Sequence, residues 1–325
     1  MLLAGIDEAG YGPILGPLTV GCCVLEVPTP DDAVVMPCAW KLLRRIASKT
    51  RDASGKKLHI HDSKKVYSPS TGLTELEQSM LVLTGLMHGA VPDDLDAALA
   101  LLAPDCVKEL VRLPWYRAFE GESFPVEVEA LSLKLKLNGA KPEFARAGVR
   151  VVELRAHVVD EQRLNRYFAA TRNKSATSFT FVATHLDRLL REHTRDDELV
   201  IFCDRQGGKE HYGPDLRRSF EDWHLEITSE TPKRAEYRLT NGPRSARLIF
   251  AEKGESECMS VAIASMLAKY LRETLMGRFN AFWKQHMPDV APTAGYWQDG
   301  QRFLRDIEPT CARLGIDPVT LARSR

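Results

Sequence analysis

The pattern of hydrophobic and polar positions predicts strands near the start and in the middle of the chain. Residues 2–6 (LLAGI) and 17–27 (PLTVGCCVLEV) are apolar and rich in β-branched side chains, and a Gly-Tyr-Gly-Pro cluster at residues 10–13 interrupts them. This arrangement is typical of two strands that pair through a tight connection. Residues 199–203 (LVIFC) form a continuous apolar run, which indicates a central strand covered on both faces.

Helical and strand patterns alternate in the rest of the chain. We expect helices at residues 39–48, 73–87, 93–102, 104–113, 176–193 and 258–274, and a mostly helical segment from residue 278 onward. Ser70 or Thr71 is the expected N-cap of the second helix. We expect strands at residues 149–159, 225–228, 236–239 and 246–251. Residues 126–137 alternate like a strand but favour a helix by composition, so both readings stay open. Together these elements predict an α/β fold, with helices on both faces of a mixed sheet.

Composition limits the classes of function that the chain can have. Its 325 residues carry 44 Lys and Arg and 44 Asp and Glu, so the formal net charge is zero. A neutral protein has no bulk attraction for a polyanion, and any contact with nucleic acid requires a local basic patch. The seven cysteines form no CxxC pair and suggest small buried side chains in a reducing compartment. Without a signal peptide or a long apolar run, we expect a cytoplasmic protein that does not enter the membrane.

Carboxylates stand where predicted strands end or a predicted helix begins. They are Asp7 and Glu8 after the first strand, Asp204 after the central strand, and Glu255 before the helix at 258–274, with Glu252 and Glu257 as alternatives to Glu255. Each one alone is explained by solvation or by helix capping. Brought together they would repel one another unless cations lay between them. Two divalent ions would neutralise them, activate a water molecule and stabilise the leaving oxygen of a phosphoryl displacement.

Five motifs, in order along the chain, resemble those of the type 2 ribonucleases H, the family of ribonucleases HII and HIII. They are GIDEAGYGP at residues 5–13 with GP at 16–17, DSKK at 62–65, FCD at 202–204, KGES at 253–256 followed by AIASMLAK at 262–269, and GY at 295–296 with Asp299. Residues 91–148 and much of 205–245 have no counterpart in this pattern.

The resemblance implies a fold and an activity. The fold would be a mixed five-stranded RNase H-like sheet in residues 1–275, with an insertion at about 91–148 and a helical extension at 276–325 that completes the substrate groove. The activity would be hydrolysis of the RNA strand of RNA/DNA hybrids with two Mg²⁺ or Mn²⁺ ions, leaving 3′-hydroxyl and 5′-phosphate ends. The protein would act as a monomer on this nucleic-acid partner.

The resemblance also implies roles for individual residues. The catalytic metal ligands would be Asp7, Glu8, Asp204 and Glu255. Contacts with the substrate would come from Gly10, Tyr11, Gly12, Ser63, Lys64, Lys65 and Tyr296. Close backbone approach at a Gly-x-Gly suits recognition of a ribose 2′-hydroxyl, which is the group that distinguishes RNA from DNA.

The chain departs from the family pattern at two of these positions. Tyr11 stands where ribonucleases HII have an arginine, and Glu255 is a glutamate, as in ribonuclease HIII, instead of an aspartate. Loss of the arginine removes a permanently charged contact, so we expect a preference for runs of ribonucleotides over a single one. Two other functions stay open: a non-catalytic binder of hybrids or other nucleic acids, and an RNase H-fold nuclease with a different substrate. The presence of all four carboxylates argues against the first.

Overall fold

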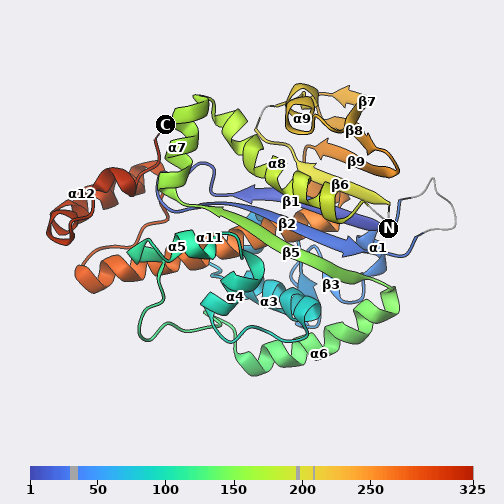
Figure 1. The fold of residues 1–325 in the computed structure, drawn as a ribbon. Helices are drawn as coiled ribbons and strands as arrows, with labels where there is room; N and C mark the ends of the chain where they lie inside the picture. Colours follow the sequence, from blue (N-terminus) through green and yellow to red (C-terminus); the bar gives the residue numbers. More distant parts are fainter. Residues whose placement is uncertain (30–35, 195–197, 208, 325) are drawn as a thin grey trace.

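The computed structural model describes residues 1–29, 36–194, 198–207 and 209–324. A seven-stranded mixed sheet crosses the molecule in the order β5-β2-β1-β6-β9-β8-β7 (Figure 1). Its strands are β1 (Leu2–Ala9), β2 (Leu18–Glu26), β5 (Arg150–Val159), β6 (Leu199–Asp204), β7 (His224–Thr231), β8 (Arg234–Asn241) and β9 (Arg244–Ala251). A separate two-stranded parallel sheet consists of β3 (Ala47–Ser48) and β4 (Leu58–His59).

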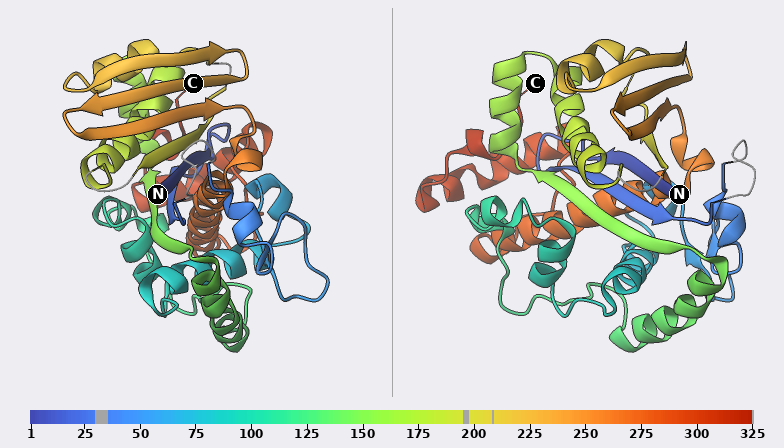
Figure 2. Two further views of the ribbon diagram at one scale, coloured as in Figure 1. Left: turned by 90° about the vertical axis from the view of Figure 1, so that its right-hand side faces the viewer. Right: turned by 45° about the vertical axis from the view of Figure 1, so that its right-hand side comes forward.

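The main sheet is parallel in its centre, at β1, β6 and β9, and antiparallel on both sides of it. β1 is antiparallel to β2 but parallel to β6, and β6 is parallel to β9. β2 and β5 are antiparallel, as are β7, β8 and β9. Figure 2 shows the yellow and orange strands β7 to β9 continuing the sheet beyond β6. The predicted mixed sheet with helices on its faces is confirmed. It has seven strands where five were expected, because the two segments at 225–228 and 236–239 lengthen into β7 and β8, of which β8 pairs with β9 and β7 pairs with β8.

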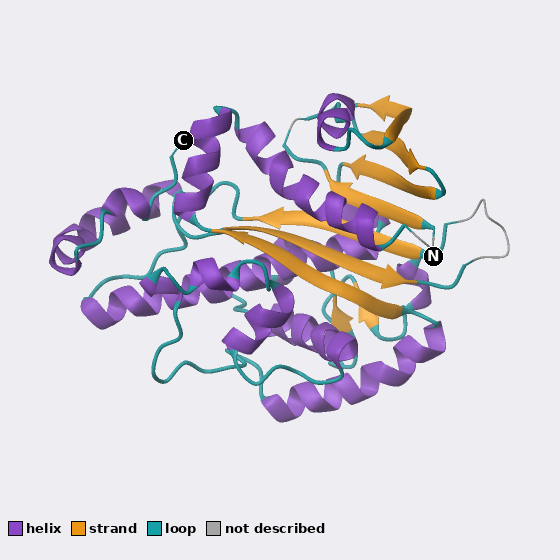
Figure 3. Cartoon of the chain, in the orientation of Figure 1, coloured by secondary structure: helices purple, strands orange, loops and turns teal. Residues whose placement is uncertain are grey.

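Helices cover both faces of this sheet (Figure 3). Their bounds are α1 (Ala39–Leu42), α2 (Ser63–Val66), α3 (Thr74–His88), α4 (Leu95–Leu102), α5 (Val107–Leu110), η1 (Pro114–Tyr116), α6 (Ala130–Ala147), α7 (Glu161–Thr171), α8 (Lys174–Glu192), α9 (Gly213–Ser219), α10 (Gly254–Glu257), α11 (Met259–His286), α12 (Trp297–Leu314) and η2 (Pro318–Thr320). No helix of the described residues is both long and apolar enough to cross a membrane.

Alternate side chains of β1 enter two separate hydrophobic cores. Leu3 faces the core that contains α3, α4, α6 and α11, whereas Leu2 and Ile6 face the core that contains α8 and α9. This alternation follows from the two-residue period of a strand. Both faces of β1 are therefore buried, and the polar residues at its end, starting with Asp7, emerge at the edge of the sheet.

Helix α11 lies directly on β1 and β2 because glycines leave room for its backbone. A Cβ atom at Gly5 would lie 2.2 Å from the Ser260 carbonyl carbon, and one at Gly21 would lie 2.2 Å from the Ala264 oxygen. The Ser260 hydroxyl also donates to the Leu3 carbonyl at 2.7 Å. The small residues predicted for this helix thus bring the start of α11, and the short α10 before it, against the end of the central strands.

The structure corrects several local expectations. Helix α3 begins after Leu73, and its first amides donate to the Glu127 carboxylate at 2.8 Å from both Leu73 and Thr74. The predicted N-caps Ser70 and Thr71 are therefore wrong, because a distant carboxylate takes the place of a local hydroxyl. The ambiguous segment at 126–137 leads into helix α6. The helices predicted at 39–48 and 104–113 are much shorter, since α1 and α5 have four residues each.

The insertion at 91–148 and the chain after residue 275 pack onto the same core as α11. The buried Arg278 of α11 donates to Glu122 and Asp96 at 2.6 Å each, and to the Tyr116 carbonyl at 3.0 Å. Helix α11 also runs without a break through residues 275 and 276, where the helical extension was expected to begin. The division into a catalytic domain and an extension stays a prediction.

Candidate active site

A pocket opens at the carboxyl ends of the parallel strands β1 and β6. Three of the four predicted carboxylates line it: Asp7, Glu8 and Asp204. The pairing of Ile6 with Cys203 places Asp7 and Asp204 at matching positions just beyond it. Among the predicted substrate residues, those that also line the pocket are Gly10, Tyr11, Gly12, Ser63, Lys64 and Tyr296. Two predicted residues, Glu255 and Lys65, are not among the residues that line it.

Burial and electrostatic repulsion raise the pKa of two carboxylates in this pocket. Burial raises the pKa of Asp7 well above its usual value, and the charge of Asp204 raises it further. Burial also raises the pKa of Asp204 to about 6, although its Oδ1 accepts a 3.3 Å hydrogen bond from the Gly254 amide. The charges of Glu255 and Glu8 add to this rise. Glu255 on α10 thus acts electrostatically on the site, and the pocket favours a proton or a cation between its carboxylates.

Two residues that the sequence motifs did not reveal orient Glu8. Its Oε2 atom accepts hydrogen bonds from the Ser178 hydroxyl of α8 at 3.0 Å and from the Gln206 Nε2 at 3.1 Å. Gln206 Nε2 also donates to the Ser178 hydroxyl at 2.5 Å. No described residue donates to the second carboxylate oxygen, Oε1, so this oxygen is free to face the pocket. The position of Gln206, two residues after Asp204, was the only signal in the sequence; Ser178 carried none.

The loop between β1 and β2 forms one wall of the pocket. Gly10 has a φ of +88°, and a Cβ atom there would lie 2.6 Å from the Arg272 side chain. A glycine is therefore required at this position. At Gly12 a Cβ atom would meet nothing within 4 Å, which leaves open space beside the pocket. Tyr11 is 45% exposed, and burial together with the charge of Glu8 raises the pKa of its phenol.

Helix α11 anchors the DSKK segment. The Ser63 amide donates to the Ser265 hydroxyl at 3.3 Å, and that hydroxyl donates to Ser63 Oγ at 3.1 Å. The Asp62 carboxylate caps α2 by accepting from the Lys64 amide at 3.0 Å. Ser63 is buried, and both Ser63 and Lys64 line the pocket.

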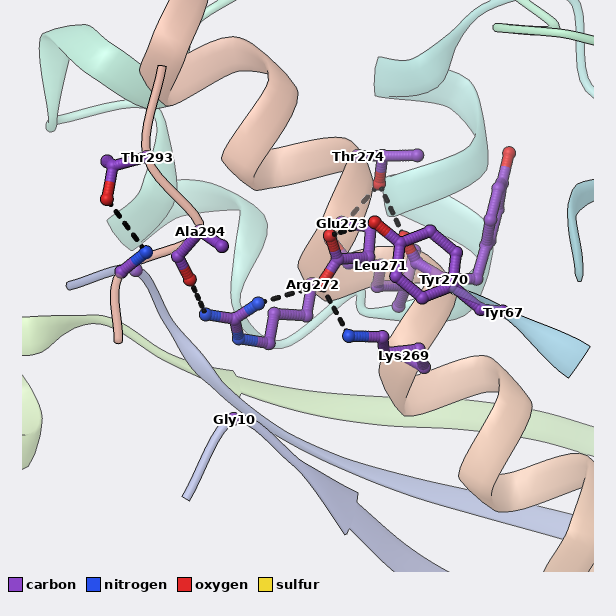
Figure 4. A network of polar contacts seen from close by, with 12 residues as sticks. Gly10, Tyr67, Lys269, Tyr270, Leu271, Arg272, Glu273, Thr274, Thr293 and Ala294 are labelled. Carbon is purple, nitrogen blue, oxygen red and sulfur yellow. Dashed lines mark hydrogen bonds and ion pairs between the residues drawn. The ribbon is translucent and has the colours of Figure 1, made fainter. Parts of the chain in front are cut away.

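Two cations that were not among the predicted site residues also border the pocket. Lys269 of α11 and Arg205 line it. Figure 4 shows Lys269 and Arg272 on either side of Glu273, which accepts from them at 2.8 and 2.7 Å. Arg272 also donates to the Ala294 carbonyl at 3.0 Å and so connects α11 to the segment before Tyr296. The pocket therefore combines a cluster of carboxylates with a positive rim, although the net charge of the chain is zero.

The donor atoms of the site suit a hard divalent cation, although no three of the predicted ligands have ligand atoms within 4.8 Å of one another in the described part of the chain. Asp7, Glu8 and Asp204 offer only carboxylate oxygens, which Mg²⁺ and Mn²⁺ prefer. Within the described part of the chain, the group of residues that meets this distance is elsewhere. Glu153, Glu192 and His193 each offer one ligand atom, and these three atoms lie within 4.8 Å of one another. That group already binds the Arg188 guanidinium, which contacts both glutamates. The four predicted metal ligands stay a prediction.

Comparisons with known proteins gave matches among solved structures alone. No protein-family model and no curated protein matches the chain. Ribonuclease HII of Archaeoglobus fulgidus, in its complex with PCNA, is 16% identical, with a TM-score of 0.47, over 100% of this chain and 95% of that one. Ribonuclease H2 of Pyrococcus horikoshii OT3 is 15% identical, with a TM-score of 0.45, over 99% and 92%. Bst-RNase HIII in complex with Mn²⁺ is 13% identical, with a TM-score of 0.42, over 99% and 66%. Over its whole length, the chain is similar to structures of ribonucleases HII and HIII at low sequence identity.

Proposed function

We propose that this protein is a metal-dependent endoribonuclease that hydrolyses the RNA strand of RNA/DNA hybrids. One observation carries the proposal: Asp7, Glu8 and Asp204 line one pocket at the ends of two adjacent parallel strands. Burial and repulsion there disfavour the charged forms of Asp7 and Asp204, and a divalent cation would relieve this cost. The ordered motifs that surround these residues in the sequence support the same conclusion, including membership of the type 2 ribonucleases H.

The proposed metal ligands are Asp7, Glu8, Asp204 and Glu255. Bound Mg²⁺ or Mn²⁺ ions would activate a water molecule and stabilise the charge that develops on the phosphate. Ser178 and Gln206 hold one oxygen of Glu8, which leaves the other for an ion. Because the site combines carboxylates with a basic rim, it suits a phosphodiester substrate better than a small neutral one.

The other predicted substrate residues, together with Lys269, would bind the hybrid. Lys64, Lys65 and Lys269 would hold phosphates as point charges. The backbone at Gly10 and Gly12 would approach the ribose closely, since neither residue has a side chain to keep it away. Tyr296 is 55% exposed beside the pocket and would pack on the sugar at the cleaved bond. We further propose that the protein acts as a monomer.

Tyr11 favours a second candidate within the same chemistry. Its phenol is exposed on the pocket wall and can stack on a sugar or base without reading a particular sequence. An RNase H-fold nuclease with a different nucleic-acid substrate would use the same carboxylates. Only the substrate can distinguish this candidate from hybrid cleavage.

A substrate panel tests the proposal. RNA/DNA hybrid, a DNA duplex with one ribonucleotide, RNA/RNA and DNA/DNA are each incubated with Mg²⁺ or Mn²⁺, using wild type, Asp204→Asn and the control Asp222→Asn. Asp222 is exposed and lies outside the pocket. We expect wild type and the control to cleave the RNA strand of the hybrid, and Asp204→Asn to be inactive. Cleavage of DNA/DNA in preference to the hybrid would favour the second candidate. Binding of the hybrid without cleavage would identify a non-catalytic binder.

A further inference from the structure

Arg323 is buried against the loop that connects β1 to β2. Arg323 is only 7% exposed, and its Nε donates to the Gly16 carbonyl at 2.9 Å. Nη1 donates to the Pro13 carbonyl at 3.2 Å and to the Gly10 carbonyl, and Nη2 donates to Gly16 as well. The Arg323 amide donates to the Ile14 carbonyl at 2.8 Å. One residue therefore binds four carbonyls of a single loop.

The hydrogen-bonding capacity of this guanidinium is directed at the backbone. Burial lowers the pKa of Arg323 to about 10. Because this value is still well above neutral pH, the group stays charged there. Within the described ranges, no carboxylate lies within ion-pair distance of it. Glu161 is the carboxylate whose charge favours the protonated form, and Glu161 itself accepts from the Tyr116 hydroxyl at 2.6 Å. The positive charge of Arg272 acts in the opposite direction. A planar fork of donors suits several fixed carbonyls at once in a way that an ammonium group does not.

The loop that Arg323 holds is a thin wall between two hollows. Tyr11, Gly12 and Pro13 line the carboxylate pocket, and the same three residues line a smaller cavity together with Leu164 and Arg323. A wall with space on both sides depends on hydrogen bonds for its position. Besides Arg323, the Gly295 carbonyl provides them by accepting from the Ile14 amide at 2.7 Å and the Leu15 amide at 3.2 Å.

We propose that Arg323 is a positioning residue that fixes the backbone of residues 10–12 for contact with the substrate. This inference rests on the proposed function and extends it to a residue far from the pocket in sequence. Without the guanidinium, three carbonyls lose their donors and the loop gains other conformations. Asp7 and Asp204 lie at the ends of two paired strands, and Ser178 and Gln206 hold Glu8, so these carboxylates do not depend on this contact. Loss of Arg323 therefore weakens substrate binding and leaves metal dependence unchanged.

The test combines hydrogen exchange with kinetics. The variants are Arg323→Ala and Arg323→Lys, with Arg313→Ala as the control, because exposed Arg313 also donates to a carbonyl, that of His286 at 2.9 Å. We expect amide exchange in residues 10–16 to become about tenfold faster in Arg323→Ala, and KM for the hybrid to rise by about tenfold, the change that corresponds to one lost charged hydrogen bond. Exchange in α11 and the Mg²⁺ concentration at half-maximal activity should match wild type. Millimolar guanidinium should restore part of both effects, and Arg323→Lys should lie between wild type and Arg323→Ala.

Several results would overturn the proposal. Unchanged exchange in residues 10–16 would show that Arg323 does not hold the loop. Faster exchange in all elements, without rescue by guanidinium, would show a general loss of stability. If Arg323→Ala fails to fold, the double variant Arg323→Gln/Glu161→Gln removes the positive charge and its buried counterpart together, and the same measurements apply. An inactive wild type would refute the proposed function alone, since the exchange experiment does not require activity.

Discussion

Gln206 donates a hydrogen bond from Nε2 to Glu8 Oε2 over 3.1 Å, and this bond connects the segment after β6 to the end of β1. Gln206 is 8% exposed and shares the Ser178 hydroxyl with Glu8. Two donors on the same oxygen fix the direction of the carboxylate. The other oxygen then has a defined position, which a metal site requires.

Replacement of Gln206 by leucine should weaken metal-dependent activity. The substitution keeps the approximate size but removes the donor, so Glu8 can rotate away from the pocket. We expect the Mg²⁺ concentration at half-maximal cleavage to rise about tenfold, because one hydrogen bond to a charged group contributes about 1.5 kcal/mol. Titration of the cleavage rate with Mg²⁺ measures this, with Gln301→Leu on α12 as the control. A metal dependence equal to that of wild type would show that Gln206 does not orient Glu8.

Asp7→Asn should abolish cleavage without loss of stability. Burial and the charge of Asp204 raise the pKa of Asp7 in the folded protein. Ionisation of Asp7 therefore lowers the free energy of unfolding as the pH rises above about 4, the pKa of an aspartate in the unfolded chain. The neutral amide avoids that cost. In EDTA at pH 8 we expect a melting temperature equal to or above that of wild type, measured by thermal denaturation. Undiminished cleavage by a clean preparation would refute the catalytic role of Asp7.

Tyr11→Arg should change which hybrid is cleaved. An arginine can form a permanently charged, two-pronged contact with phosphate, whereas the phenol can only stack or form a neutral hydrogen bond. We expect the ratio of rates to shift about tenfold toward the substrate with a single ribonucleotide, equivalent to about 1.4 kcal/mol in the transition state. Rates on the two substrates measure the ratio, and Tyr11→Phe should retain the wild-type value. If wild type cleaves both substrates equally, Tyr11 does not determine specificity.

The pH dependence of stability should reveal a buried neutral histidine. Burial lowers the pKa of His157 to about 4, with contributions from the charges of Arg163 and Arg155 that Asp105 partly opposes. Because the folded pKa lies below the unfolded value of about 6.5, the stabilisation is present above pH 6.5 and is lost as the pH falls toward 4. A full shift of this size corresponds to roughly 3 kcal/mol.

His157→Phe should remove this part of the acid sensitivity. The ring of His157 stacks on Phe181 with centroids 5.7 Å apart, so phenylalanine preserves the contact. Urea denaturation at several pH values between 4 and 7 gives the free energy of unfolding. The exposed His88 provides the control His88→Phe, which should keep the wild-type slope. An unchanged slope in His157→Phe would assign the acid sensitivity to other groups, such as the buried His185, whose pKa is also lowered, to about 3.

Local patterns predicted the elements that carry the site, and distant contacts decided the rest. The apolar run before Asp204 and the breaker after Glu8 are readable because strand period and turn residues are local properties. The Glu127 cap of α3 is about fifty residues away from the amides that it binds, and no local rule reveals such a partner. Arg323 is hidden in the same way, because a single arginine in a sequence does not show which carbonyls it will meet.

The glycines beneath α11 have a consequence for mutational scans of this protein. At Gly5 and Gly21 the spacing between sheet and helix is set by main-chain atoms, with a hypothetical Cβ only 2.2 Å from the α11 backbone. Any substitution must push a long buried helix outward, and with it α10 and Glu255. In a saturation library scored by activity, Gly5 should therefore be as intolerant as Asp7, two residues away, although it has no chemical role. A protein-abundance score would separate the two positions, because the glycine variants would be lost from the soluble fraction while Asp7→Asn would persist.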